Sequence, residues 1–291
     1  MKKTYFYAGS AIFVWSTIAT ISKILLGNLN SFQVLNISAL FGAIFLFVVN
    51  VVTGNIKNLK SFKIKDYIIT ALIGLTGTCF YNIFYYGGTA RMLASQAFIV
   101  NYLWPIMSVV FACILLKEKM TVRKIIAIAM SFLGVIIVTG TDLINFDKNT
   151  IIGAISCVFG AISYGLFTAL NQKYNYDKRL AIMIAYVATF LLTLIVNIAR
   201  GDMFVPDFTQ TLGLAWNGAF VMAVGSTCWA IALESGKTAK VSNLAYITPF
   251  LSLVWTFFIL GEPIKLTSVL GLVVIILGIF IQLKDKKTNQ Q

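Results

Sequence analysis

The chain has 291 residues, of which 59% are hydrophobic and only 11% carry a charged side chain. Soluble domains average roughly 45–50% apolar and about 25% charged residues, so the composition excludes an ordinary soluble protein and also a disordered one. The sequence contains no histidine and only ten acidic residues, which disfavours most hydrolytic and metal-dependent catalysis. We therefore expect a helical membrane protein that is not an enzyme and needs no metal and no cofactor.

A membrane-spanning helix needs about 20 mostly apolar residues. Ten stretches of the sequence meet this requirement, and the residues left over suffice only for short loops and a short tail. In chain order the predicted spans are 4–26, 31–53, 67–86, 95–116, 123–140, 151–171, 180–199, 211–233, 241–260 and 266–283. The predicted fold class is therefore all-α and integral to the membrane, with ten transmembrane helices.

Positive charge is distributed unequally between alternate loops. If the N-terminus is cytoplasmic, the cytoplasmic segments carry 18 of the 23 Lys and Arg residues and the outer segments carry 5, whereas the acidic residues divide evenly. Lys and Arg concentrate on the cytoplasmic side of membrane proteins, so we predict that both termini are cytoplasmic. The same bias accounts for the net charge of +13 without a nucleic-acid partner, and anionic lipid headgroups can add to the attraction.

The middle of every predicted span is free of Asp, Glu, Lys and Arg. Charges within a membrane usually mark proton relays, voltage sensors or counter-ions. Their absence argues against a carboxylate-based proton pump and against a retinal pigment, which needs a buried lysine. A substrate is expected to be neutral, zwitterionic or held by aromatic faces.

The two halves of the sequence resemble each other. At an offset of 144 residues, 101–140 aligns without gaps on 245–284, with nine of the 40 positions identical. Both copies share a proline, a glutamate 13 residues later and a glycine 16 residues after that, namely Pro105, Glu118 and Gly134, and Pro249, Glu262 and Gly278. Because each half holds five spans, we predict two inverted five-helix repeats, 1–143 and 144–291, that together form one transport unit. Such repeats are typical of secondary transporters, and a duplicated scaffold without transport is the alternative.

Pro105 and Pro249 lie within the fourth and ninth predicted spans. Proline removes a backbone hydrogen bond and clashes with the preceding turn, and membrane helices tolerate it where neighbours or a cavity satisfy the freed carbonyl. The symmetric placement favours a pair of helix bends that take part in gating beside a central site. A packing kink is the alternative at each position.

Polar and aromatic residues recur at helical spacing on several spans. Asn101, Trp104, Pro105 and Ser108 follow the spacing of one helix face, and 78, 81, 82 and 85 do so on the third span. A buried polar tip needs a partner, and clustered aromatic faces suit an aromatic or cationic guest. Packing between helices is the alternative for any single residue. The predicted substrate-binding residues are Trp15, Tyr81, Asn82, Tyr85, Asn101, Trp104, Tyr164, Trp229 and Tyr246.

The ten spans, the repeat and the proline-to-glutamate spacing resemble the drug/metabolite transporter superfamily, specifically its EamA-domain exporters, over the whole chain. A sharper resemblance rests on Val100-Asn101-Tyr102-Leu103-Trp104-Pro105, which is similar to the fourth-helix motif of the bacterial aromatic amino acid exporters of that superfamily. The shorter stretches 14–17, 171–174 and 246–249 are similar to that group too.

This resemblance implies a basket-like fold of ten helices in the bacterial plasma membrane, with a central cavity and alternating access. It also implies export of aromatic amino acids, with flat cations such as methyl viologen as further substrates, and it places Trp104 and Tyr81 in the cavity. The sequence departs from these exporters where Tyr164 replaces a tryptophan and Asn82 replaces an acid. We expect a small-molecule substrate, membrane lipids as surroundings and a monomer.

Four hypotheses remain open. The first is a secondary exporter of aromatic or related amino acids, with weak or no direct proton coupling because no acid is buried. The second is an exporter of other metabolites, nucleobases or cationic drugs, which substrate competition would distinguish. A membrane enzyme would need a buried acid, base or nucleophile pair, which the sequence does not show. A sensor or scaffold would bind a ligand without flux.

Overall fold

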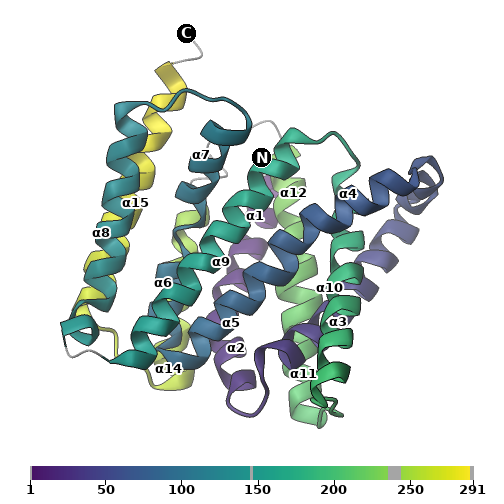
Figure 1. Cartoon of the computed structure of the whole chain (residues 1–291), viewed down its shortest axis with the longest axis horizontal. Helices are drawn as coiled ribbons and strands as arrows, with labels where there is room; N and C mark the ends of the chain where they lie inside the picture. Colours follow the sequence, from purple (N-terminus) through teal and green to yellow (C-terminus); the bar gives the residue numbers. More distant parts are fainter. Residues whose placement is uncertain (1, 145–146, 235–243, 289–291) are drawn as a thin grey trace. The chain divides into compact units, whose positions relative to one another are not determined.

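The computed structural model describes residues 2–144, 147–234 and 244–288, and within these ranges all regular structure is helical (Figure 1). Each of the first eight predicted spans coincides with a helical segment that is long and apolar enough to cross a membrane. These segments are Lys3–Leu26, Ser31–Val52, Ile64–Arg91, Ala94–Leu115, Val122–Gly140, Lys148–Lys173, Lys178–Arg200 and Phe208–Ala232.

The last two predicted spans fall on shorter apolar helices, Ala245–Leu260 and Leu266–Gln282. Part of the ninth predicted span, residues 241–243, lies outside the described residues. The total of ten spans and the cytoplasmic placement of both termini therefore stay predictions.

The chain divides into two compact units, and each is described by itself. Unit 1 comprises Met1–Cys79 and Tyr176–Trp255, and unit 2 comprises Phe80–Asn175 and Thr256–Gln291. Each unit therefore combines helices from both halves of the sequence.

Unit 1 is assembled mainly around α3, which packs against α10 and a π-helical stretch, while α1 packs against α12. Its α-helices are α1 (Lys2–Ser16), α2 (Ile18–Leu26), α3 (Ser31–Val52), α4 (Ile64–Leu75), α10 (Lys178–Arg200), α11 (Phe208–Ala215) and α12 (Gly225–Glu234). Two 3₁₀-helices, η1 (Asn55–Ser61) and η4 (Ala245–Ile247), and two π-helical stretches, η2 (Thr76–Phe80) and η3 (Trp216–Val224), complete it. The last residue of η2 belongs to unit 2.

Unit 2 is assembled around α9, which packs against α5, α6 and α7, while α8 and α15 form a closely packed pair that is visible in Figure 1. Its helices are α5 (Tyr81–Arg91), α6 (Ala94–Asn101), α7 (Trp104–Leu115), α8 (Val122–Ile144), α9 (Lys148–Lys173) and α15 (Leu266–Thr288). Helix α14 (Thr248–Leu260) begins in unit 1 and ends in unit 2.

Polar side chains in the loops determine where several helices begin. The Asn30 side chain accepts hydrogen bonds from the backbone N–H groups of Phe32 and Gln33 at 3.0 Å each, and the Gln33 side chain accepts from the Asn30 N–H at 2.9 Å. These bonds satisfy N–H groups that have no partner within the first turn of a helix. Helices α9, α10 and α11 are capped in a similar way by Asp147, Asp177 and Asp207.

Both repeat prolines stand at the second position of an α-helix, and the regular α-helical pattern is interrupted just before each of them, within the segments Ala94–Leu115 and Ala245–Leu260. Helix α6 ends at Asn101 and α7 begins at Trp104, so Pro105 lies in the first turn of α7. Pro249 lies likewise in α14, directly after η4. A proline cannot bond the carbonyl four residues before it and its ring clashes with that carbonyl, which for Pro105 belongs to Asn101. Asn101 and Trp104, expected on one helix face, therefore belong to two helices, and the gating role of the prolines stays a prediction.

The two π-helical stretches also occupy equivalent positions in the sequence repeat. Residues 144 positions after η2 lie inside η3. A π-helical turn holds more residues than an α-helical turn, so it rotates the face presented by the residues that follow. Thr78, expected on one face with Tyr81, instead forms a 2.7 Å hydrogen bond with Thr189 of α10.

Glycines allow the helices of unit 2 to approach closely. A Cβ atom on Gly134 of α8 would lie 2.5 Å from Cγ1 of Ile275 and 2.7 Å from the backbone oxygen of Gly271, both on α15. Small residues that let backbones approach are the usual device for helix association in membranes, where tight packing replaces the hydrophobic effect. The α8–α15 pair therefore depends on Gly134.

We predict that Gly134→Ala destabilises the detergent-solubilised protein by about 1–3 kcal/mol, because the backbone of α15 would have to move. The matched control is Gly140→Ala on the same helix, where a Cβ would meet nothing within 4 Å. Thermal unfolding of both variants tests the prediction, and equal melting temperatures for the two would contradict it.

The repeat glutamates Glu118 and Glu262 have different partners. The Glu262 carboxylate is buried and accepts hydrogen bonds from the N–H groups of Ala94 at 2.7 Å and Ser95 at 3.0 Å and from the Ser95 hydroxyl at 2.8 Å. It thereby caps the start of α6, where a negative charge also favours the helix dipole. Glu118 is a third exposed and pairs with Nζ of Lys124 at 3.0 Å.

Glu262→Gln is expected to lower the free energy of unfolding by about 1–3 kcal/mol, because buried N–H donors lose a charged acceptor. Glu118→Gln serves as the comparison and is expected to cost less than Glu262→Gln, because Glu118 is a third exposed and its buried partner Lys124 keeps the Lys119 carbonyl at 2.9 Å as an acceptor. Unfolding in detergent with increasing denaturant measures both. The role of Glu262 as the buried cap of α6 is contradicted if Glu118→Gln lowers the free energy of unfolding as much as Glu262→Gln does.

Candidate functional site

Five of the predicted site residues gather in unit 2, and we call them the Tyr81 cluster: Tyr81 and Tyr85 of α5, Asn101 of α6, Trp104 of α7 and Tyr164 of α9. The Tyr164 ring centroid lies 4.8 Å from that of Tyr81 and 5.2 Å from that of Trp104. Tyr85 stacks on Tyr81 at 6.1 Å with nearly parallel rings. Four helices thus bring four aromatic rings and one amide together.

The cluster has a buried layer and a partly exposed layer. Tyr85 is completely buried and Asn101 is 2% exposed, whereas Tyr81, Trp104 and Tyr164 are only half-buried. The Asn101 Nδ2 donates a hydrogen bond to the Tyr81 hydroxyl oxygen at 2.9 Å. Three residues of the cluster therefore keep part of their surface exposed, and the buried pair supports them. Asn82, also predicted for the site, is buried with 4% exposure.

Two other predicted residues meet in unit 1. The rings of Trp15 on α1 and Trp229 on α12 lie 5.3 Å apart at an angle of 53°. The Trp15 indole N–H donates to the carbonyl of Val221 in η3 at 3.1 Å. A Cβ on Gly225 would lie 2.5 Å from Trp15 Nε1, so only a glycine leaves room for this indole. Tyr246 lies half-buried on η4 of the same unit.

Two further tryptophans escaped the sequence analysis, and both bind the junction between α1 and α2. The indole N–H of Trp216 donates to Oγ1 of Thr17 and that of Trp255 donates to Oγ of Ser16, both at 2.9 Å. The sequence signal that could have pointed to these two tryptophans is the stretch 14–17, which we considered only for its similarity to known exporters. Its two hydroxyls are the acceptors that these tryptophans need.

The indole groups therefore divide into two functional kinds. Trp15, Trp216 and Trp255 each direct the N–H group to another part of unit 1. Trp104 packs against Tyr102 and Tyr164, and among the described residues its N–H group has no hydrogen-bond acceptor. Trp229 is also half-buried, and its N–H group likewise has no acceptor among the described residues, so Trp104 and Trp229 are the tryptophans whose N–H groups remain open to a ligand.

The Tyr81 cluster contains hydrogen-bonding groups and π faces but no carboxylate, amine or thiol. Within the described ranges, no group of three or more His, Cys, Asp and Glu side chains could hold a metal ion. The arrangement suits binding of a flat molecule rather than catalysis. The Tyr81 cluster and the Trp15–Trp229 pair belong to different units, so a single cavity lined by both stays a prediction.

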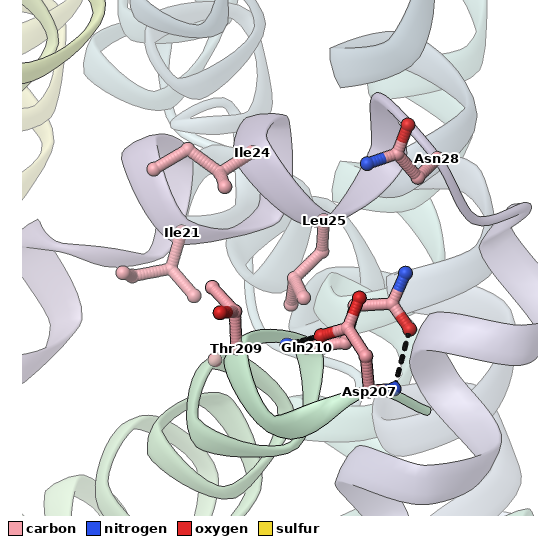
Figure 2. Close-up of a pocket in the computed structure, with 8 residues that line it drawn as sticks. Ile21, Ile24, Leu25, Asn28, Asp207, Thr209 and Gln210 are labelled. Carbon is pink, nitrogen blue, oxygen red and sulfur yellow. Dashed lines mark hydrogen bonds between the residues drawn. The ribbon is translucent and has the colours of Figure 1, made fainter. Parts of the chain in front are cut away.

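Figure 2 shows a pocket of unit 1 that contains none of the predicted residues. Its walls come from α2 and the residue stretch after it on one side and from the start of α11 on the other, namely Ile21, Ile24, Leu25, Asn28, Asp207, Thr209, Gln210 and Gly213. The Asp207 carboxylate accepts a hydrogen bond from the Gln210 N–H group at 2.8 Å, and the Gln210 side-chain oxygen accepts one from the Asp207 N–H group at 3.0 Å. Because these polar groups cap α11, we do not assign the pocket to the functional site.

Comparison with known proteins gives a consistent result. The chain is 28% identical to an uncharacterized transporter from Clostridium kluyveri, over 99% of this chain and 96% of the relative. It is 26% identical to a probable terminal-alkyne amino-acid exporter from Streptantibioticus cattleyicolor, over 69% of this chain and 67% of the relative. A solved crystal structure matches with a TM-score of 0.69 at 17% identity and covers 96% of both chains, which establishes the fold alone.

The model of the EamA-like transporter family matches residues 2–140 and again residues 151–283. These two segments together include nearly all of the chain and all of the predicted site residues. The relatives are named as transporters, and the helices of the structure are long and apolar enough for a multi-pass membrane protein. On this evidence the chain belongs to the EamA-like transporter family.

Proposed function

We propose that the protein is a secondary transporter that exports aromatic or related amino acids across the bacterial plasma membrane by alternating access. The observation that carries this proposal is the Tyr81 cluster. Half-buried Tyr81, Trp104 and Tyr164 present ring faces together with hydrogen-bonding edges, and no charged side chain belongs to the cluster. Stacked and edge-to-face ring contacts favour an aromatic guest.

The choice of an amino acid as substrate has support from one relative. The protein from Streptantibioticus cattleyicolor carries a name that describes amino-acid export. A zwitterion has no net charge, so it can enter a site without formal charges at lower cost than an ion. The cluster therefore fits a zwitterion with a flat side chain.

We further propose that residues 1–143 and 144–291 are two inverted repeats with ten spans and cytoplasmic termini, and that the protein acts as a monomer. The two segments matched by the family model support this division, as do the paired helix starts at Pro105 and Pro249. The bias of Lys and Arg supports the orientation. In this proposal the helix breaks before the two prolines are the points at which each repeat flexes between its two states.

An exporter of other metabolites, nucleobases or cationic drugs is the second candidate. Tyr164, which stands where the aromatic amino acid exporters have tryptophan, contacts both Tyr81 and Trp104. A smaller ring at the centre of the cluster would change the shape of the guest that fits. Competition between amino acids, nucleobases and methyl viologen distinguishes the two candidates.

The proposal predicts saturable flux of labelled Phe and Trp into proteoliposomes that contain the purified protein. Trp104→Ala should lower this flux roughly tenfold or more, because a buried ring face is worth about 1.5–3 kcal/mol. The matched control is Phe258→Ala, which removes an aromatic ring that is 75% exposed and lies outside the cluster. Flux that is equal in Trp104→Ala and Phe258→Ala would move the binding site elsewhere.

Direct proton coupling is expected to be weak or absent, because the Tyr81 cluster contains no group that titrates near neutral pH. Flux at a fixed substrate protonation state should therefore be the same with and without a pH gradient across the vesicle. Strong acceleration by the gradient would show that a titratable group elsewhere in the chain takes part.

A further inference from the structure

We propose that Asn101 is a positioning residue that fixes the Tyr81 hydroxyl as a hydrogen-bond donor, so that the site selects substrates carrying an acceptor oxygen such as a carboxylate. This inference rests on the proposed function, and it names the chemical group that the site recognises. A donor at Tyr81 would make the site prefer amino acids, which carry a carboxylate, over cations that bind only to the ring faces.

The hydrogen bond between the two residues has a defined direction. Nδ2 of Asn101 lies 2.9 Å from the Tyr81 hydroxyl oxygen and donates to it. An amide nitrogen can only donate, whereas a phenol oxygen accepts and also carries one hydrogen of its own. Tyr81 therefore keeps its hydrogen for another acceptor.

Close packing holds the Asn101 amide in this orientation. The residue is 2% exposed, and its Oδ1 lies against α9, where a Cβ on Gly160 would come within 3.2 Å of it. That Oδ1 is buried without a hydrogen-bond partner among the described residues. A buried unpaired carbonyl is unfavourable, and Asn197 of unit 1 shows the same pattern of a bonded Nδ2 and an unpaired Oδ1. The other end of α6 is held by Glu262.

No described residue accepts the hydrogen of the Tyr81 hydroxyl. Tyr81 is half-buried and its ring contacts Tyr164, which contacts Trp104 in turn. A substrate whose flat side chain lies against these rings can bring an oxygen to the Tyr81 hydroxyl. Because hydrogen bonds to charged acceptors are the strong ones, a carboxylate gains more from this donor than a neutral group does.

The test compares ligands that share a ring and differ in the acceptor. Phe and 3-phenylpropionate carry a carboxylate, whereas 2-phenylethylamine has the ring and the amine without it. Equilibrium binding of each to purified protein in detergent gives the preference for the carboxylate, and flux of labelled Phe in proteoliposomes is measured in parallel. We expect the wild type to bind both carboxylates roughly tenfold more tightly than the amine.

Two substitutions remove the donor in different ways. Tyr81→Phe deletes the hydroxyl and keeps the ring. Asn101→Asp keeps the shape but offers only acceptor oxygens, so the Tyr81 hydrogen is drawn to the new carboxylate. Both variants should lose the preference for carboxylates and retain binding of 2-phenylethylamine within about threefold, a difference of less than 1 kcal/mol. Gly160→Ala should shift the preference in the same direction by pressing on the Asn101 oxygen.

The control variant is Tyr5→Phe, which removes a hydroxyl from a tyrosine that is 46% exposed on α1. It should leave the preference unchanged. A merely structural role for Asn101 would weaken binding of all three ligands alike, and that result would overturn the proposal. The proposal also fails if Tyr81→Phe keeps the wild-type preference, even where Asn101→Asp does not fold.

Export of amino acids and recognition of a carboxylate by Tyr81 are distinguished by separate outcomes. Carboxylate preference without any flux of Phe or Trp would overturn the proposed export and support the recognition assigned to Tyr81. Flux without carboxylate preference would support the export and overturn this assignment. A wild-type protein that binds none of the three ligands overturns both.

Discussion

A helix in a bilayer has to satisfy its own backbone groups, because the hydrocarbon offers no water to replace a lost hydrogen bond. This chain nevertheless interrupts its helices around Thr17, at Tyr102 and Leu103, in η4 and in two π-helical stretches. Near several of these points another helix supplies a side-chain donor. Trp216 and Trp255 donate to the hydroxyls at the α1–α2 junction, and Trp15 donates to a carbonyl of η3. The interruptions in unit 1 are thus part of its packing.

The same constraint explains why the Tyr81 cluster differs from its surroundings. Helix α6 ends at Asn101 because Pro105 lacks the N–H that would continue it, and this ending lies beside α9. Asn101 directs its amide N–H to Tyr81 rather than to backbone, and its carbonyl oxygen has no partner among the described residues. Unused hydrogen-bonding capacity also occurs in unit 1, at Thr20 and Asn197, but in the Tyr81 cluster it lies among partly exposed aromatic residues.

Hydropathy and length sufficed to predict the first eight spans, since both are local properties of the sequence. The repeat spacing found the two prolines, but not the interruption before each of them, because length and hydropathy identify 95–116 and 241–260 only as whole spans. The π-helical stretches have no local signature, so the separation of Thr78 from Tyr81 was missed. Glu262 and Ser95 lie 167 residues apart, and no rule of sequence spacing pairs them. The residues of the Tyr81 cluster were proposed from helical spacing and resemblance, yet the direction of its hydrogen bond required the structure.

The neutrality of the Tyr81 cluster has a consequence for the conditions in which such a site can work. Dissolved salt screens interactions between formal charges, and ring faces, hydroxyls and an amide offer none on the protein side. Where the salt concentration rises, binding that relies on solvent-exposed pairs of charges weakens. A site built from uncharged groups keeps its affinity when the internal salt concentration rises. Tolerance of changing osmolarity would thus follow from the chemistry of five side chains.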